Sequence, residues 1–188
     1  RMHTSGKDPQ RLTDHPNRDI SPALSADGQQ VAFISDRDGN YEIYRVSITG
    51  QDLRRLTYSE MDENEPRWSP DGQRIVFVAD DVGEGNFDIF TVGSDGRDLQ
   101  RLTQFQRRNH APAYSPDGQR IVFESDREGD FEIYTMDTAG QDAQRLTFHP
   151  AWDRNPSWTS DGQFIDFESW RDGNWEIYRV PAAGGPPV

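Results

Sequence analysis

Short runs of apolar residues alternate with polar, turn-forming segments along the whole chain. Runs such as IVFV at 75–78 and FDIF at 87–90 combine β-branched and aromatic residues, and Gly, Asp, Ser and Pro separate such runs from one another. Runs of this kind between turn residues are typical of β-strands. No segment repeats its apolar positions at the helical period of about 3.6 residues. The pattern therefore predicts an all-β protein.

Two sequence markers show that the strands belong to a repeating unit. Arg-Leu-Thr stands at 11–13, 55–57, 101–103 and 145–147, and Asp-Gly stands at 27–28, 71–72, 117–118 and 161–162. Both series advance by 44, 46 and 44 residues. The two additional residues fall in a longer loop at 80–86. Four copies of one unit therefore cover nearly the whole chain.

Each copy predicts four short strands joined by tight turns. The predicted first strands begin at a proline, at 22–25, 66–69, 112–115 and 156–159. The second strands start at 31, 75, 121 and 165, and the third strands cover 41–44, 87–90, 131–134 and 175–178. The fourth strand carries Arg-Leu-Thr. A unit of about 40–50 residues with four strands is a blade of a β-propeller, so we expect four-stranded antiparallel blades with Trp68 and Trp158 mostly buried between them.

The composite motif of the repeat is also specific enough to indicate a family. The strings NEPRWSPDGQRIVFVAD at 64–80 and SDRDGNYEIY at 35–44, together with the Arg-Leu-Thr triplets, resemble the TolB-type propeller repeat. The resemblance covers about residues 7–185. It implies a partner-binding propeller in the periplasm or outside the cell of a bacterium, and rings that more often have six to eight blades.

The ends of the chain suggest how a ring is closed. We expect residues 1–188 to form a single propeller domain, with blades at about 14–57, 58–103, 104–147 and 148–184. Residues 1–13 then form a closing outer strand, and 11–13 complete the last blade. One chain could close a four-bladed ring, or two chains could exchange end strands in a homodimer of eight blades. We favour the homodimer because a ring of four blades requires a large rotation from each blade to the next. The third interpretation is that the chain is a piece of a longer propeller.

Composition and charge exclude several classes of protein. The formal net charge is −13, which argues against a nucleic-acid binder because such proteins cluster Lys and Arg on one face. The chain contains no run of about 18 apolar residues, so the sequence does not predict insertion into a membrane. The chain has no Cys, so it has neither disulfides nor a thiolate site.

Signals for catalysis are lacking, so we expect no enzymatic activity. The Gly-x-Ser-x-Gly motif of serine hydrolases does not occur, and the four His lack the spacing of metal ligands. Acids recur on the third strands, at Glu42, Asp88, Glu132 and Glu176. A catalytic pair needs two unlike environments, whereas these four are equivalent. We interpret them as partners of the arginines in the Arg-Leu-Thr triplets.

One ring of oxygen donors is a candidate metal site. Three residues before each first-strand proline stand Asp19, Glu63, Asn109 and Asp153. Innermost strands of a propeller start at the mouth of its channel, so these side chains are predicted to form a collar there. Carboxylate and amide oxygens suit Ca²⁺, and a cation in the channel is therefore one hypothesis. A purely structural role in capping the strand ends is the other.

Beside the collar the repeats cease to agree, which marks a candidate binding face. The residues concerned are Arg18, Asp62, Arg108, His110, Trp152 and Arg154. Repeat proteins place binding specificity at such positions, and Trp and Arg are common interface anchors. The sequence therefore predicts a non-catalytic scaffold that binds a protein or peptide partner at the channel mouth. The alternatives are an enzyme or enzyme subunit acting on a peptide or saccharide in the channel, and a purely structural ring.

Overall fold

The computed structural model describes residues 9–80, 85–104 and 107–185, and these form fifteen β-strands. In chain order the strands are β1 (Asp19–Leu24), β2 (Gln30–Ser35), β3 (Glu42–Ser47), β4 (Arg54–Arg55), β5 (Asp62–Trp68), β6 (Arg74–Asp80), β7 (Phe87–Gly93), β8 (Gln100–Arg101), β9 (Asn109–Tyr114), β10 (Arg120–Ser125), β11 (Glu132–Asp137), β12 (Gln144–Arg145), β13 (Asp153–Trp158), β14 (Phe164–Ser169) and β15 (Glu176–Pro181). None of the described residues forms a helix long and apolar enough to cross a membrane.

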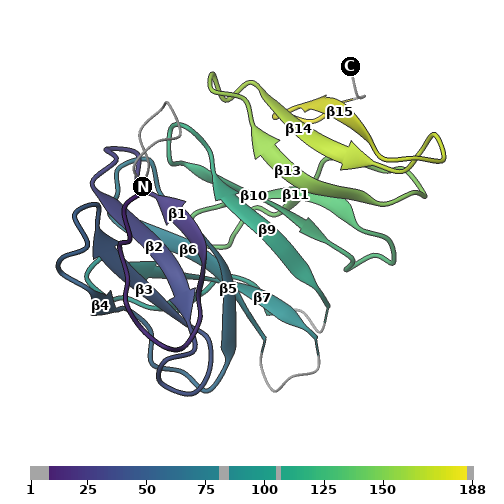
Figure 1. Ribbon diagram of the computed structural model, residues 1–188. Coiled ribbons are helices and arrows are strands. Elements are labelled where there is room, and N and C mark those ends of the chain that lie inside the picture. Colours follow the sequence, from purple (N-terminus) through teal and green to yellow (C-terminus); the bar gives the residue numbers. More distant parts are fainter. Residues whose placement is uncertain (1–8, 81–84, 105–106, 186–188) are drawn as a thin grey trace.

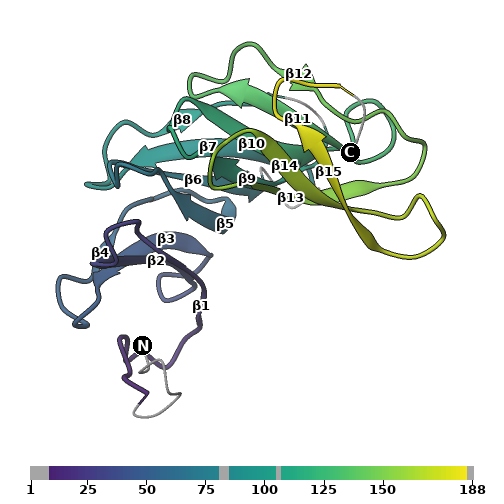
Figure 2. The same ribbon diagram turned by 90° about the horizontal axis from the view of Figure 1, so that it is seen from above.

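The strands form four antiparallel sheets in chain order, β1–β4, β5–β8, β9–β12 and β13–β15. These are blades of the predicted propeller, and the all-β prediction is confirmed. Neighbouring blades touch through their first strands, β1 with β5, β5 with β9 and β9 with β13. The blades follow one another in an arc, with β1 and β15 at opposite ends in both views (Figures 1 and 2).

The first strand of each blade begins earlier than the sequence pattern predicts. It starts three or four residues before the proline and continues past it, with a register shift in its pairing to the second strand. The residue before each proline adopts a positive φ of 50–57°, at Ser21, Glu65, Ala111 and Asn155. A residue that precedes proline avoids the right-handed helical conformation. The register shift at this point is a β-bulge, and the strand continues on the other side of the bulge.

The core lies between the blades rather than inside any one of them. In the first junction, Ile43 and Leu56 of one blade pack with Ile75 and Phe77 of the next, and all four are at most 1% exposed. The second and third junctions repeat this arrangement. A blade therefore needs a neighbour on each face to bury its apolar side chains.

Trp68 and Trp158 keep only a minor part of their surface exposed, which agrees with the expectation that they are mostly buried between blades. Each packs against the core of a junction and donates its indole N–H to a carbonyl of the preceding blade, Ala23 at 3.0 Å and Ala113 at 3.2 Å. The outer edge of each indole lines a hollow that stays open to solvent.

The two ends of the chain are not joined within the described residues. Leu12 packs on Phe33, Tyr44 and Val46 of the first blade, in the way that Leu56 packs on the second. The segment 11–13 therefore lies beside the first blade, but it forms no strand. The sheet β13–β15 has three strands in the part of the chain that is described, so 11–13 does not complete the last blade of its own chain as one closure scheme required. Completion of this blade by a second copy stays a prediction. Residues 1–8 of the predicted closing strand lie outside the described residues.

Candidate functional site

The four predicted collar residues lie at the start of the innermost strands, as their spacing implied. Glu63, Asn109 and Asp153 are nevertheless 0% exposed, and the side chain of Asp19 is 13% exposed. The three fully buried residues each hydrogen-bond to the preceding blade. They therefore occupy the junctions between blades, and the prediction that they face the channel is wrong.

Glu63 shows how such a side chain is held. Its Oε2 accepts hydrogen bonds from the backbone N–H of Ile43 at 3.0 Å and from the Thr57 hydroxyl, and its Oε1 accepts from the Ser59 hydroxyl at 3.1 Å. Burial, followed by repulsion from the Glu42 carboxylate, raises the pKa of Glu63 to about 8. Glu63 is therefore protonated at neutral pH in the folded chain.

The equivalent residues close the next two junctions. Asn109 donates its amide to the Phe87 carbonyl at 2.8 Å and to Asp88 Oδ1 at 3.4 Å. The backbone N–H of Asp153 donates to the Phe131 carbonyl at 2.8 Å, and its carboxylate pairs with Arg171 of its own blade at 3.0 Å. Among the described residues, no three His, Asp or Glu side chains gather closely enough to hold a metal ion.

Four of the predicted binding residues, in contrast, meet around the ring of Phe131. The guanidinium carbons of Arg108 and Arg154 lie 5.2 and 4.6 Å from the centre of this ring. The ring centres of His110 and Trp152 lie 6.2 and 6.1 Å from it. Phe131 directly precedes β11, whereas Trp152 and Arg154 flank the start of β13, so this Phe131 cluster straddles the third junction.

Buried carboxylates hold both arginines of the Phe131 cluster in place. Glu124 Oε1 accepts from two nitrogens of Arg154 at 3.0 and 2.8 Å, and Asp126 accepts from Arg108 Nε at 2.8 Å. Glu124 is 0% exposed and Asp126 is 5% exposed. Because the guanidinium groups are already paired, their planar faces are presented to the aromatic ring in a fixed position.

The other two predicted binding residues gather at the first junction, around Tyr41. Arg18 donates to the Tyr41 hydroxyl at 3.2 Å, and the backbone N–H of Tyr41 donates to Asp62 Oδ1 at 3.0 Å. Tyr41 stands at the same position of the repeat as Phe131. The predicted binding set is therefore split between two junctions, and most of it belongs to the Phe131 cluster.

Sequence reasoning missed two tryptophans that extend this surface. Trp170 and Trp175 line a pocket of about 570 Å³ together with Trp152, Pro150 and Ala151. Trp170 stands where the first and third blades carry Asp36 and Asp126. That departure from the repeat was the available signal, whereas Trp175 reads as an ordinary aromatic position of the third strand.

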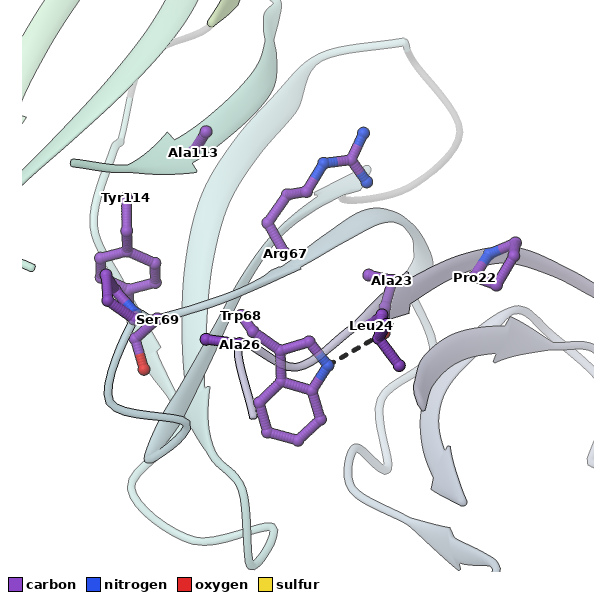
Figure 3. A pocket seen from close by; sticks show the side chains of 10 residues that line it. Pro22, Ala23, Leu24, Ala26, Arg67, Trp68, Ser69, Ala113 and Tyr114 are labelled. Carbon is purple, nitrogen blue, oxygen red and sulfur yellow. Dashed lines mark hydrogen bonds between the residues drawn. The ribbon is translucent and has the colours of Figure 1, made fainter. Parts of the chain in front are cut away.

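A second hollow of about 530 Å³ opens at the other ends of the innermost strands. Trp68 lies in it between Tyr114 on one side and Ala23 and Leu24 on the other (Figure 3). The Trp68 indole is fixed by its hydrogen bond to the Ala23 carbonyl. The lining is mostly small and apolar, and no cluster of titratable groups faces it.

Comparisons with known proteins agree with this architecture. Residues 88–187 match a family model described as the TolB beta propeller domain, and residues 1–87 match the Tricorn protease N-terminal beta propeller domain. No curated protein sequence matches the chain at the significance required.

Solved structures show the same fold in longer proteins. A protein assigned as TolB from Agrobacterium tumefaciens is 27% identical, with a TM-score of 0.78 over 94% of this chain and 62% of its own. TolB from Acinetobacter baumannii is 25% identical, with a TM-score of 0.80 over 99% of this chain and 46% of its own. Oligogalacturonate lyase from Vibrio parahaemolyticus is 14% identical, with a TM-score of 0.77 over 100% of this chain and 58% of its own, and this likeness concerns the fold alone. The chain thus spans less than two thirds of each.

Proposed function

The chain belongs to the TolB beta propeller domain family, and on that premise we propose that it is a non-catalytic scaffold that binds a protein or peptide partner. The observation that carries the proposal is the Phe131 cluster at the channel-mouth end of the blades. It combines a half-exposed Trp152 with two arginines that are already held by buried carboxylates. Trp and Arg carry much of the binding energy in protein interfaces, and a pre-ordered surface loses little entropy on binding.

The electrostatics of the site support a role without catalysis. Three acids lie near the Phe131 cluster: Glu124 and Asp126 are engaged by arginine, and Glu65 faces His110 at 3.6 Å and accepts from the backbone N–H of Ala111. Glu63 has the pKa of a general acid, but it is 0% exposed and its oxygens already accept three hydrogen bonds. By similarity to the TolB proteins, we place this activity in the periplasm of a bacterium.

A displayed library of random peptides tests the binding role. We expect enriched peptides whose binding is lost in Trp152→Arg, a change that the fold accommodates because Arg18 and Arg108 occupy the same position of the repeat. The control is Gln119→Ala, in the hairpin turn between β9 and β10 at the other end of a blade, which should leave binding unchanged. The proposal would be contradicted if the library enriched no peptide, or if the enriched peptides bound the Trp152→Arg variant as well as the parent chain. Turnover of a peptide or an oligosaccharide would contradict its non-catalytic part.

We propose in addition that a second copy of the chain completes the ring. Three blades contain an ion pair between a third-strand acid and the arginine of Arg-Leu-Thr, namely Glu42 with Arg55, Asp88 with Arg101, and Glu132 with Arg145. One half of a fourth pair stands at each end of the arc. Glu176 is exposed on β15, and within the described residues Arg11 forms its ion pair with Asp14, three positions along the chain.

The blades at the two ends of the arc also expose apolar side chains that the inner blades bury. Ile177 is 70% exposed, whereas Ile43, Ile89 and Ile133 at the same position of the repeat are 0% exposed. Leu24 is 58% exposed at the opposite end, where the equivalent Trp68 packs against the preceding blade. Two chains that exchange their end strands would bury both faces twice, in an isologous assembly of eight blades.

A designed disulfide tests this exchange in a chain that has no cysteine of its own. Thr91 lies opposite Gln100, and Thr135 lies opposite Gln144, so the repeat places Arg179 opposite Gln10 of a second copy. Opposed residues in antiparallel strands are close enough for a disulfide.

Gln10→Cys combined with Arg179→Cys should therefore give a covalent dimer under mild oxidation. The control, Thr135→Cys with Gln144→Cys, should form a bond within each chain. Three results for the test variant would contradict the exchange. They are a disulfide within one chain, a series of covalent products larger than a dimer, and no disulfide at all.

A further inference from the structure

Two acids stand opposite each other at the channel-mouth end of the second blade. Asp62 is the first residue of β5 and Asp80 is the last residue of β6, and the antiparallel pairing of these strands places the two residues directly across from one another. Side chains of opposed residues lie on the same face of a sheet, with Cβ atoms about 5 Å apart. Like charges in this arrangement destabilise the pairing of the strands.

The first and third blades carry a cation where the second blade carries Asp62. Arg18 and Arg108 stand at this position, opposite Asp36 and Asp126. In the third blade Arg108 Nε donates to Asp126 Oδ2 at 2.8 Å, and the backbone N–H of Arg108 donates to Asp126 Oδ1 at 2.9 Å. In the first blade the backbone N–H of Arg18 donates to Asp36 Oδ1 at 2.8 Å. These two blades therefore match the acid with an arginine, and the second blade does not.

The acid of the second blade is buried and keeps one oxygen without a partner. Asp80 is 9% exposed, and its Oδ2 accepts from the backbone N–H of Gly85 at 3.0 Å. Its Oδ1 is buried and accepts no hydrogen bond within the described residues. A buried acceptor in this state costs free energy. The loop sequence at 81–86 contains no Lys or Arg that could replace the arginine of the other blades.

A bound metal ion would remove both the repulsion and the unsatisfied oxygen. Carboxylate oxygens are the ligands that hard divalent cations prefer, and Ca²⁺ accepts irregular sets of them. Asp80 supplies the buried Oδ1, and Asp62, whose Oδ1 accepts from the backbone N–H of Tyr41 at 3.0 Å, retains further acceptor capacity on its carboxylate. We propose that Asp62 and Asp80 together bind a hard divalent cation, with Ca²⁺ as the best match, in place of the arginine of the first and third blades.

The number of protein ligands sets the strength of this Asp62–Asp80 site. Two carboxylates leave most of the coordination to water, so we expect a dissociation constant on the order of 10⁻³ M, as in extracellular calcium modules. The bound ion would tie the start of β5 to the end of β6. The site lies in the second blade, whereas the Phe131 cluster straddles the third junction. The assignment is therefore independent of the proposed partner binding, and either can fail without the other.

Thermal unfolding of the full chain, after removal of metal with a chelator, tests the assignment. About 10 mM CaCl₂ should raise the melting temperature by about 3 °C or more over NaCl of the same ionic strength. Calorimetric titration should give one Ca²⁺ per chain. Asp62→Arg places in the second blade the residue that the first and third blades carry, so it should fold without calcium and lose the response. Glu60→Gln, which changes an exposed acid just before β5, should respond as the parent does.

Three results would overturn the assignment. They are equal melting temperatures in CaCl₂ and in NaCl, a calcium response that persists in Asp62→Arg, and a response that Glu60→Gln reduces as much as Asp62→Arg does. Asp80→Asn keeps the shape of the side chain and lowers its charge, so it decides the question if Asp62→Arg does not fold. A calcium response retained in Asp80→Asn would likewise overturn the assignment.

Discussion

Replacing Glu63 by glutamine should abolish a pH dependence of stability that this side chain imposes on the first blade junction. Glu63 is fully buried and protonated at neutral pH in the folded chain, with a pKa of about 8. In the unfolded chain its pKa returns to about 4.5. Glutamine has nearly the same shape and is never charged, so the variant isolates the ionisation from the packing.

The sign and size follow from proton linkage. Below about pH 4.5 the group is protonated in both states and contributes nothing to the slope. Between about pH 5 and pH 8 only the unfolded chain releases the proton, so the free energy of unfolding falls by about 1.4 kcal/mol for each pH unit. The stability lost by the wild type across this window is on the order of 4 kcal/mol. Above about pH 8 both states are ionised and the loss stops.

The chain itself indicates that an amide fits at this position. Asn109 occupies it in the third blade and donates to Asp88. In the first junction Glu63 faces the negative charge of Glu42, and an amide removes the repulsion between the two side chains. We expect this variant to match the wild type at about pH 5 and to exceed its stability by several kcal/mol at about pH 8.

Urea denaturation at a series of pH values, followed by tryptophan fluorescence at one protein concentration, measures the effect. Glu60→Gln is the matched control, because Glu60 is exposed in the loop that precedes β5, and this variant should behave as the wild type does. A wild type whose stability is flat between about pH 5 and pH 8 would refute the reasoning, as would a Glu63→Gln variant with the wild-type slope.

Other positions give independent tests, each by urea denaturation. Trp68→Ala should cost about 3 kcal/mol of stability because it empties part of the first junction. Trp68→Phe loses mainly one hydrogen bond and should cost about 1 kcal/mol. Equal costs of the two variants would mean that packing of this side chain is unimportant. Gly140→Ala should cost about 3 kcal/mol or more because its new Cβ would lie 2.4 Å from the Leu102 carbonyl oxygen, while Gly28→Ala, at a φ of +69° in open space, should cost about 1 kcal/mol. The reverse order would contradict the junction geometry. Ile133→Ala should cost about 3 kcal/mol, and Ile177→Ala should instead weaken association between chains.

The blades could be predicted from the sequence because their determinants are local. Turn residues, alternating apolar positions and the fixed spacing of the triplets all lie within one repeat. The pairing of Glu42 with Arg55 was predictable for the same reason, since adjacent strands of one blade bring the two side chains together. The sequence did not show that Glu42 would be fully buried, because the residues that cover it belong to the next blade.

The candidate site was predicted only in part, for physical reasons that concern two features. The innermost strand begins before the proline at which its sequence pattern starts, with a residue of positive φ such as Glu65 in between, so the facing of the residues before the proline could not be read from the pattern. Among them, Glu63 lies in the junction instead of the channel. The Phe131 cluster was hidden because Phe131 stands at an ordinary core position of its own repeat. Only the packing of two blades brings Trp152 and Arg154 onto its ring.

The mass of the protein in solution tests the central claim, that two open arcs complete one ring, most directly. Light scattering on the intact chain should give about 43 kDa, twice the 21.5 kDa of one chain, and this value should not rise with concentration because the ring is closed. A mass of 21.5 kDa at all concentrations, or one that grows without limit as concentration rises, would contradict closure by a second copy.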